Sequence, residues 1–429
     1  MTSDIDLDLL DLRRDVSKRP RSKFRGVGFL LSSALALIAG TVMLTVGLDR
    51  ELVGLLGIAL FLGLLGTSTP VGVAMALSGT VGLYALAGAS SFRRSFIDLP
   101  YGAAGSWTLS VIPMFILMGL LLWKSGATTR MFDAARAWFG WLPGSHAITV
   151  ILTGGGLAAA SGSTLGIAHA VGRIGLPEML RAGYDKRLTI GSLLMAGMPG
   201  QVIPPSLLLV VFAGTAGVPV GPQLLAGIIP GVLLIAALCL TVVAVSIVWP
   251  ALAPRGEWDA GWAERRRTLA RVWPVPLIVL VVIGGMQVGI MTPTEAGAVG
   301  ALMALVLCLA FNARGERVRS VVAALKASAV SVGSLFLLII GAAFLNRMVT
   351  LSGIPQLFAD WVSSVELGAV YAVVLTLLII LVLGAFMESA SMLLVTMPVF
   401  LPVLIEFDVN LLWYGVLAVF AAELALITP

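Results

Sequence analysis

Long apolar segments separated by short polar stretches run through almost the whole 429-residue chain. After a charged stretch over residues 1–26, apolar segments lie at 27–47, 52–67, 70–89, 109–123, 146–180, 188–222, 223–250, 273–291, 294–312, 328–345, 367–405 and 411–429. A transmembrane helix needs about 20 mostly apolar residues, so the chain could cross a bilayer about ten times. Glycine, proline and serine interrupt the three longest segments. The pattern predicts an all-α polytopic membrane protein in which some helices are broken.

The composition excludes a soluble protein. Hydrophobic residues make up 59% of the chain and charged residues only 11%, whereas a soluble domain has about 25% charged residues. The net charge of +5 does not indicate nucleic acid binding, because the basic residues lie in short stretches between apolar segments. With two cysteines and two histidines, neither a disulfide framework, a His/Cys metal cluster nor an organic cofactor is expected.

The distribution of basic residues predicts the topology. If 146–180 and 367–405 each enter and leave the membrane on one side, 23 of the 27 Lys and Arg residues fall on the same face. Cytoplasmic loops are enriched in Lys and Arg, so this face and the N-terminus are expected to be cytoplasmic. Ordinary spans at both places would scatter the charges. The charges therefore favour two re-entrant hairpins.

The two halves of the chain share short motifs in the same order, about 225 residues apart. The pairs are Thr69-Pro70 with Thr292-Pro293, Phe115 and Gly119 with Phe336 and Gly341, Ser125-Gly126 with Ser352-Gly353, Leu176-Pro177 with Leu401-Pro402, and Ile203-Pro204 with Thr428-Pro429. Each half has an odd number of crossings and one hairpin, so the halves are inverted repeats. Inverted repeats around interrupted helices are typical of secondary transporters, which bind solute at the repeat interface.

These features divide the chain into five predicted parts. They are a cytoplasmic tail (1–26), an extra transmembrane helix and loop (27–51), a first repeat (52–250), a basic cytoplasmic loop (251–272) and a second repeat (273–429). The second repeat stops just after its proline motif, whereas the first continues into another apolar half-helix. We therefore expect the last helix of the second repeat to be truncated at Pro429.

Small hydroxyl residues mark the predicted tip of the first hairpin, at Ser161, Gly162, Ser163 and Thr164. Glycine permits the turn, and hydroxyl and carbonyl oxygens can hold a hard cation. The alternative is that these small residues only let helices pack closely. The following segment contains Gly200, Pro204, Pro205 and Ser206, and its prolines remove amide donors and leave carbonyls free. A simple proline kink is the alternative there.

An acidic residue marks the tip of the second hairpin. Glu388 is followed by Ser389 and Ser391, and Thr428 lies in the next proline motif. An ionisable group at membrane depth costs at least ~2.5 kcal/mol and should face a cavity or a partner. A protonated or interfacial glutamate is the alternative. Glu295 follows Thr292 in a capping-box pattern, which favours a structural role.

The chain resembles the large membrane subunit of the tripartite ATP-independent periplasmic (TRAP) transporters. The motifs that carry the resemblance cover residues 52–429 and are Ser161-Gly162-Ser163, Arg173-Ile174-Gly175-Leu176-Pro177-Glu178-Met179, Gly183-Tyr184-Asp185-Lys186, Ile203-Pro204-Pro205-Ser206, Leu225-Ala226-Gly227-Ile228-Ile229-Pro230-Gly231, Thr292-Pro293-Thr294-Glu295-Ala296-Gly297, Phe386-Met387-Glu388, Pro398-Val399-Phe400-Leu401-Pro402 and Leu426-Ile427-Thr428-Pro429. The resemblance implies an elevator-type, sodium-coupled carrier in the bacterial inner membrane. It also implies a small four-helix membrane subunit and a periplasmic solute-binding protein as partners.

The resemblance implies sodium sites where each hairpin tip meets the following unwound helix. The expected cation ligands are Ser161, Gly162, Ser163, Thr164, Gly200, Pro204, Glu388, Ser389, Ser391 and Thr428. The expected solute-binding residues are Ser163, Pro205, Ser206 and Ser389. Because the chain stops at Pro429, the second cation site is expected to be incomplete.

Three other functions remain open on the sequence. They are a stand-alone sodium–carboxylate symporter of the same architecture, a truncated membrane scaffold that does not transport, and an intramembrane enzyme. The enzyme ranks last because no nucleophile and base pair is apparent on facing helices.

Overall fold

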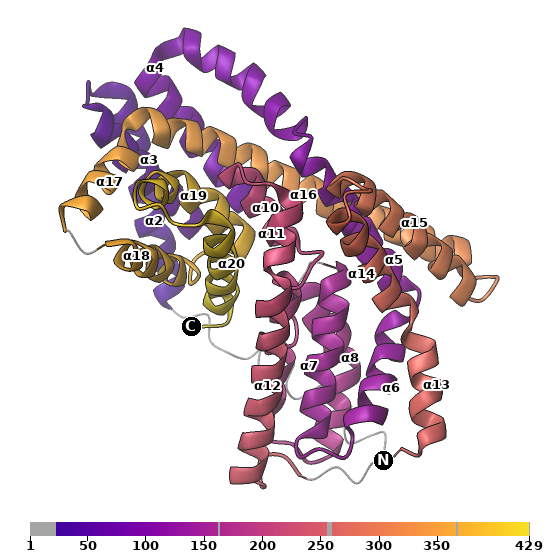
Figure 1. Cartoon of the computed structure of the whole chain (residues 1–429). Coiled ribbons are helices and arrows are strands. Elements are labelled where there is room, and N and C mark those ends of the chain that lie inside the picture. The colour runs from indigo at the N-terminus through magenta and orange to yellow at the C-terminus, as the bar shows by residue number, and fades with distance from the viewer. Residues whose placement is uncertain (1–22, 162–163, 255–259, 366–367, 429) are drawn as a thin grey trace.

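The computed structural model describes residues 23–161, 164–254, 260–365 and 368–428. These residues form helices and connecting turns, with no strand in the ranges given (Figure 1). In chain order the helices are α2 (Lys23–Thr45), α3 (Arg50–Gly66), α4 (Val71–Ala104), η1 (Thr108–Ser110), α5 (Val111–Lys124), α6 (Ala127–Phe139), α7 (Ser145–Ser161), α8 (Thr164–Arg181), α9 (Lys186–Met195), η2 (Met198–Gln201), α10 (Leu207–Ala216), α11 (Val220–Ala226), α12 (Ile228–Val248), α13 (Trp262–Val272), α14 (Pro274–Gln287), α15 (Pro293–Phe311), α16 (Arg317–Ser352), α17 (Ile354–Ser364), α18 (Gly368–Leu383), α19 (Ser389–Glu406) and α20 (Leu411–Ile427). The predicted all-α membrane fold is confirmed.

Fewer helices than the sequence suggested are long enough to cross a bilayer. Among the described residues six helices qualify by length and composition, or up to eight if each bent helix pair is one span. One of the six is α19, an arm of the second hairpin. Shorter apolar helices lie at Ser145–Leu157, Leu207–Ala216, Gly368–Leu383 and Leu411–Ile427. Hydropathy alone cannot separate these from full spans, because half-helices buried in protein are as apolar as helices that face lipid.

Four helices from the two halves form a framework that repeats the same contacts. Helix α16 packs along α4, and α15 packs along α5. An ideal Cβ at Gly341 in α16 would collide with the Gly72 carbonyl oxygen of α4, and one at Gly297 in α15 would lie 3.0 Å from Met114 of α5. The repeated Thr-Pro and Phe/Gly motifs therefore place glycines where helices of different halves cross.

The repeated Ser-Gly motif ends the preceding helix in both halves. Gly126 and Gly353 each have a φ of +80°, a conformation that costs glycine little. The hydroxyls of Ser125 and Ser352 each donate to the carbonyl three residues earlier, at 2.7 Å. At Gly126 the chain turns by 67° into α6. The first hairpin therefore follows a helix that leaves the framework at a sharp bend.

Helix α2 is the predicted extra N-terminal helix, and it packs on α3. Gly63 and Gly66 of α3 lie against Ser32 of α2, where an added Cβ at Gly63 would be 3.0 Å from the Ser32 carbonyl oxygen. Small residues at such crossings let helices approach closely in a membrane. Most of the remaining α2 surface is exposed, as expected for a peripheral helix that faces lipid.

Two pairs of antiparallel helices correspond to the predicted hairpins, α7 with α8 and α18 with α19 (Figure 1). Their arms have 16 to 18 residues, which corresponds to about 24 to 27 Å at 1.5 Å per residue. The hydrocarbon core is about 30 Å thick. Arms of this length fit segments that enter the membrane and return to the same side.

Candidate functional site

The first hairpin packs against the break in the following helix. Gly154 of α7 lies against Ala196, where an added Cβ would collide with the Ala196 carbonyl oxygen. A Cβ at Gly155 would lie 3.6 Å from Pro199 and closer still to Ile235. The glycines before the tip thus let the broken backbone approach α7 directly.

The predicted tip residues lie where α7 ends and α8 begins. Ser161 is the last residue of α7 and Thr164 is the first of α8. Gly162 and Ser163 lie outside the described residues. The predicted ligand roles of all four therefore stay predictions.

The helix break between α9 and α10 contains the predicted Gly200, Pro204, Pro205 and Ser206, all buried. The Pro204–Pro205 peptide bond is cis. Ser206 begins α10, and its hydroxyl accepts the Leu209 backbone N–H at 3.2 Å and donates to the Gln201 carbonyl oxygen. The sequence therefore breaks the helix and restarts it with a serine N-cap. A solute could use only the remaining lone pair of this hydroxyl.

The tip of the second hairpin gathers oxygen atoms from the start of α19 and from α20. Glu388 begins α19, and the Ser391 hydroxyl lies 3.4 Å from its carboxylate Oε1. The buried Ser389 hydroxyl donates to the Ala422 carbonyl oxygen of α20 at 3.3 Å. Thr428 follows α20, and its hydroxyl donates to the carbonyls of Leu424 and Ala425 at 3.2 Å. Glu388, Ser389 and Ser391 are thus brought together beside α20.

Helix ends reinforce the chemistry of this tip. The N-terminus of α19 carries partial positive charge, and the C-terminus of α20 carries partial negative charge, which favours a cation. Gly384 lies so close to Ala425 that a Cβ there would collide with it. The close approach holds the hairpin tip against the end of α20, where a carboxylate, hydroxyls and carbonyls can surround a hard cation.

An open cavity of about 540 Å³ separates this tip from the framework. Volumes of this size are usual for small-molecule sites. The lining residues come from the start of α4, the middle of α16, the second tip and the end of α20: Pro70, Val71, Gly72, Ser334, Leu337, Leu338, Gly384, Phe386, Met387, Glu388 and Leu426. Glu388 is the charged residue of this lining.

Both interrupted regions belong to one packed unit. Helix α20 contacts η2 and α10, and α10 also packs against α19. The Gln223 side chain of α11 donates to the Leu412 carbonyl oxygen of α20 at 3.2 Å. The first hairpin, the first break and the second tip therefore sit in a body built from both halves. Among the described residues no three His, Cys, Asp or Glu side chains form a metal cluster.

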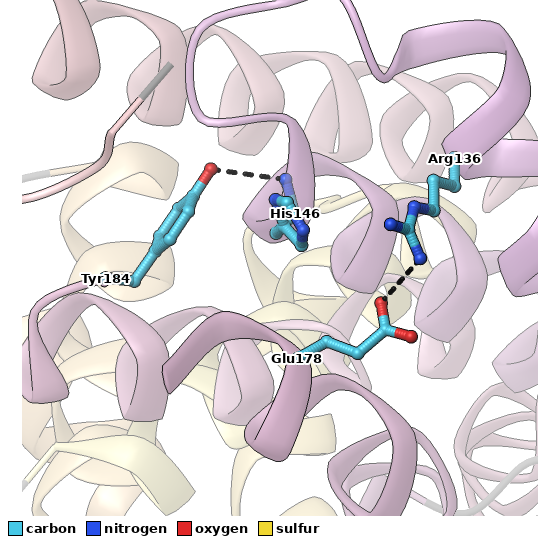
Figure 2. A network of polar contacts seen from close by, with 4 residues as sticks. All are labelled: Arg136, His146, Glu178 and Tyr184. Atoms are coloured by element: carbon cyan, nitrogen blue, oxygen red, sulfur yellow. Dashed lines mark hydrogen bonds and ion pairs between the residues drawn. The ribbon is translucent and has the colours of Figure 1, made fainter. Parts of the chain in front are cut away.

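The opposite end of the first hairpin is held by a polar network (Figure 2). Arg136 of α6 pairs with Glu178 of α8 at 3.2 Å, and both side chains are 32% exposed. The His146 backbone N–H, in the first turn of α7, donates to the Tyr184 hydroxyl at 3.3 Å. Burial raises the pKa of this phenol. The half-exposed ion pair contributes about 0–1 kcal/mol, whereas the tyrosine satisfies an N–H that the helix itself leaves unpaired.

The Gly183-Tyr184-Asp185 motif serves this network through local backbone chemistry. Gly183 has a φ of +80° and its N–H donates to the Leu180 carbonyl, while the Tyr184 N–H donates to the Met179 carbonyl. These two bonds form a Schellman motif that ends α8. The Asp185 carboxylate then accepts the Arg187 backbone N–H at 2.8 Å and begins α9. One motif ends a helix, starts the next and caps α7 through Tyr184.

Sequence reasoning missed several residues of the cavity. Ser334 gave no usable signal, because a single serine in an apolar segment has many structural uses. Pro70 was marked only as part of a repeated motif. The capping box at Thr292 was predicted correctly: its hydroxyl accepts the Glu295 N–H at 3.4 Å, and the Glu295 carboxylate accepts the Thr292 N–H at 2.7 Å.

Comparisons with known proteins agree with the sequence motifs. Residues 58–429 match the family model described as "Tripartite ATP-independent periplasmic transporter, DctM component". The chain is 32% identical over 338 residues to the C4-dicarboxylate TRAP transporter large permease protein of Pseudomonas aeruginosa, covering 78% of each protein. It is 28% identical over 374 residues to the sialic acid TRAP transporter large permease protein of Vibrio cholerae, covering 86% of this chain and 85% of that protein.

A solved structure shows a related fold. The Alcanivorax borkumensis YdaH transporter, whose crystal structure reveals an unusual topology, superposes with a TM-score of 0.54. It covers 80% of each chain at 18% sequence identity, so this likeness concerns the fold alone. The matched proteins are multi-pass transporter permeases, and the TRAP large permeases work with a small membrane subunit and a periplasmic binding protein. The family match and the broken-helix fold lead to one conclusion: this chain belongs to the DctM component family of the tripartite ATP-independent periplasmic transporters.

Proposed function

We propose that this chain is the permease of a sodium-coupled secondary transporter that takes up a small organic acid or similar solute. A periplasmic binding protein delivers the solute, and a small four-helix subunit accompanies the permease in the bacterial inner membrane. The observation that carries the proposal is the Glu388–Ser391 tip, which faces an open cavity of about 540 Å³ next to the framework. Relatives named for C4-dicarboxylate, sialic acid and ectoine support a carboxylate-bearing solute.

Sodium is the proposed coupling ion at two places. One is the tip residues Ser161, Gly162, Ser163 and Thr164 with Gly200 and Pro204, and the other is Glu388, Ser389, Ser391 and Thr428. Solute would contact Ser163, Pro205, Ser206 and Ser389 beside these ions. Sodium binds hard oxygen ligands. Helix breaks supply backbone carbonyl oxygens that accept no hydrogen bond within a helix and can therefore bind the ion.

An elevator movement is the proposed mechanism. The unit formed by α7–α10 and α18–α20 is internally packed, and the cavity separates its second tip from α4 and α16. Such a unit can move as a body against the framework and carry ions and solute together. Neutralising Glu388 with a cation would lower the cost of moving its charge across the membrane.

Uptake by reconstituted vesicles tests the function. Vesicles with the permease, its small subunit and loaded binding protein should accumulate solute under an inward sodium gradient and not under an equal potassium gradient. Ser163→Ala should raise the sodium concentration for half-maximal uptake about tenfold, because a hydroxyl bound to an ion contributes about 1.5 kcal/mol or more. Ser364→Ala, at the exposed end of α17, is the control. Equal accumulation in potassium would contradict sodium coupling.

The proposed orientation places the N-terminus and the basic loop at 251–272 in the cytoplasm. Its support is the asymmetry of the basic residues, 23 of 27 on one face, and the positive-inside rule. Cysteines introduced at Arg266 and Asp360 should react with a membrane-impermeant reagent from opposite sides of intact cells. We expect labelling from outside at position 360 in α17 and protection at 266. The reverse pattern would overturn the topology.

A further inference from the structure

A narrow cleft at the ends of four helices carries two arginines that the transport function does not use. Its walls come from the end of α5, the start of α6, the α13–α14 junction and the end of α15. Arg130 of α6 and Arg271 of α13 both line the cleft, close enough that their charges repel each other. The rest of the lining is apolar apart from Ser125.

No described residue forms a short ion pair with either arginine. Within the described ranges, the Arg130 guanidinium lies 3.8 Å from the centre of the Phe311 ring, and the ion pair within 4.0 Å is the one between Arg136 and Glu178. Stacking on a ring uses the face of a guanidinium and leaves its N–H edge available. Asp133 is the acidic group that acts on Arg271 at longer range. Two guanidinium groups on one cleft therefore have free donors and excess positive charge.

The surroundings of the cleft favour a lipid over a free anion. Helix α13 carries Arg265, Arg266 and Arg267 beside the exposed apolar side chains of Trp262 and Leu269. Trp273 is 54% exposed at the α13–α14 junction. Basic and aromatic residues on an amphipathic helix are typical of a segment at the headgroup level. An acyl chain could lie along the exposed apolar surface while its phosphate reaches the arginines.

The cleft also lies where the helix that leads into the first hairpin meets helices that pack with the framework. Helix α6 leads into the first hairpin, whereas α14 and α15 belong with the framework. A direct contact between α6 and α13 already exists, because Trp138 Nε1 donates to the Arg265 carbonyl oxygen at 3.1 Å and Arg265 Nε donates to the Ala137 carbonyl oxygen at 3.2 Å. A ligand at Arg130 and Arg271 would add a second link beside it.

We propose that Arg130 and Arg271 bind the phosphate of an anionic phospholipid at this cleft. Guanidinium groups bind phosphate oxygens through paired N–H donors, which a lone surface charge does not provide. The site is independent of solute and sodium binding. Its lipid would hold α6 against the α13–α14 junction and α15.

Native mass spectrometry of the full-length protein tests the proposal with phosphatidylglycerol as the probe. We expect selective retention of phosphatidylglycerol over phosphatidylcholine. Affinity should fall about fivefold in Arg271→Gln and about thirtyfold when Arg130→Gln is added, since each substitution removes a direct hydrogen bond to the phosphate. Arg271 is exposed, so its single variant should fold. Arg266→Gln, an exposed arginine of the same helix that does not line the cleft, should change retention little.

Two results would overturn the proposal. One is unchanged phosphatidylglycerol retention in Arg271→Gln, or an equal loss in Arg266→Gln. The other concerns the source of the phosphate: inorganic phosphate alone should not raise the melting temperature, whereas phosphatidylglycerol should. A shift with inorganic phosphate that depends on Arg271, without lipid retention, would identify a small-anion site instead of a lipid site.

Discussion

Gly341→Ala should lower the stability of the protein, although alanine normally stabilises a helix relative to glycine. A Cβ at Gly341 would collide with the Gly72 carbonyl oxygen, which is backbone and cannot turn away. Helices α16 and α4 would have to separate along a long shared contact. Overpacking costs about 1–3 kcal/mol and sometimes more, so we expect a loss of about 3 kcal/mol. Thermal unfolding of the purified protein measures it.

Gly333→Ala is the matched control for this prediction. Gly333 lies in the same helix, and an added Cβ there meets nothing within 4 Å. This substitution should leave stability unchanged or raise it by about 0.5–1 kcal/mol through helix propensity. A melting temperature of Gly341→Ala equal to that of Gly333→Ala would contradict the close crossing of α4 and α16.

Glu388→Gln should severely weaken sodium-dependent uptake while preserving the fold. The amide keeps the size of the side chain and can still bond to the Ser391 hydroxyl, which lies 3.4 Å from the carboxylate. It removes a full negative charge. A negative charge about 4 Å from a sodium ion attracts it by about 1–4 kcal/mol in a surface environment. Without that charge, sodium affinity should fall about tenfold to thousandfold. The sodium concentration for half-maximal uptake reports the change.

Glu406→Gln controls for loss of an acidic residue on the same helix. Glu406 lies at the other end of α19, where its carboxylate accepts a bond from the Ser363 hydroxyl at 2.6 Å. Its substitution should not change sodium dependence. If Glu388→Gln altered solute affinity and left sodium dependence intact, Glu388 would bind the solute rather than the ion.

The sequence predicted the Thr292 capping box correctly. The Ser125-Gly126 and Ser352-Gly353 motifs, which the sequence marked only as repeats, end helices, and Ser206 caps α10. All of these features act within a few residues. Each of these features depends on the dihedral preference of a residue, or on a backbone N–H or carbonyl group that has no partner within the helix. These features can be recognised in the sequence without knowing what the helix packs against.

The number of spans was less predictable, and so was the environment of each polar residue. Hydropathy did not distinguish the arms of α18 and α19 from full crossings, because both are apolar. Ser206 illustrates the second limit: its hydroxyl is engaged in capping α10, which its position in a proline motif did not reveal. A serine at a break can cap, bind a ligand or do both, and only the neighbouring atoms decide.

The sequence by itself determined the membrane class, the helix breaks, the order of repeated motifs and the family. All of these follow from composition and short-range backbone chemistry, which need no partner far along the chain. The tertiary structure alone decided that Gly72 meets Gly341, that Glu388 faces a cavity beside Ser334, and that Arg130 and Arg271 share a cleft. These contacts join residues more than 50 positions apart, because the crossing of packed helices depends on side-chain shape over both surfaces at once.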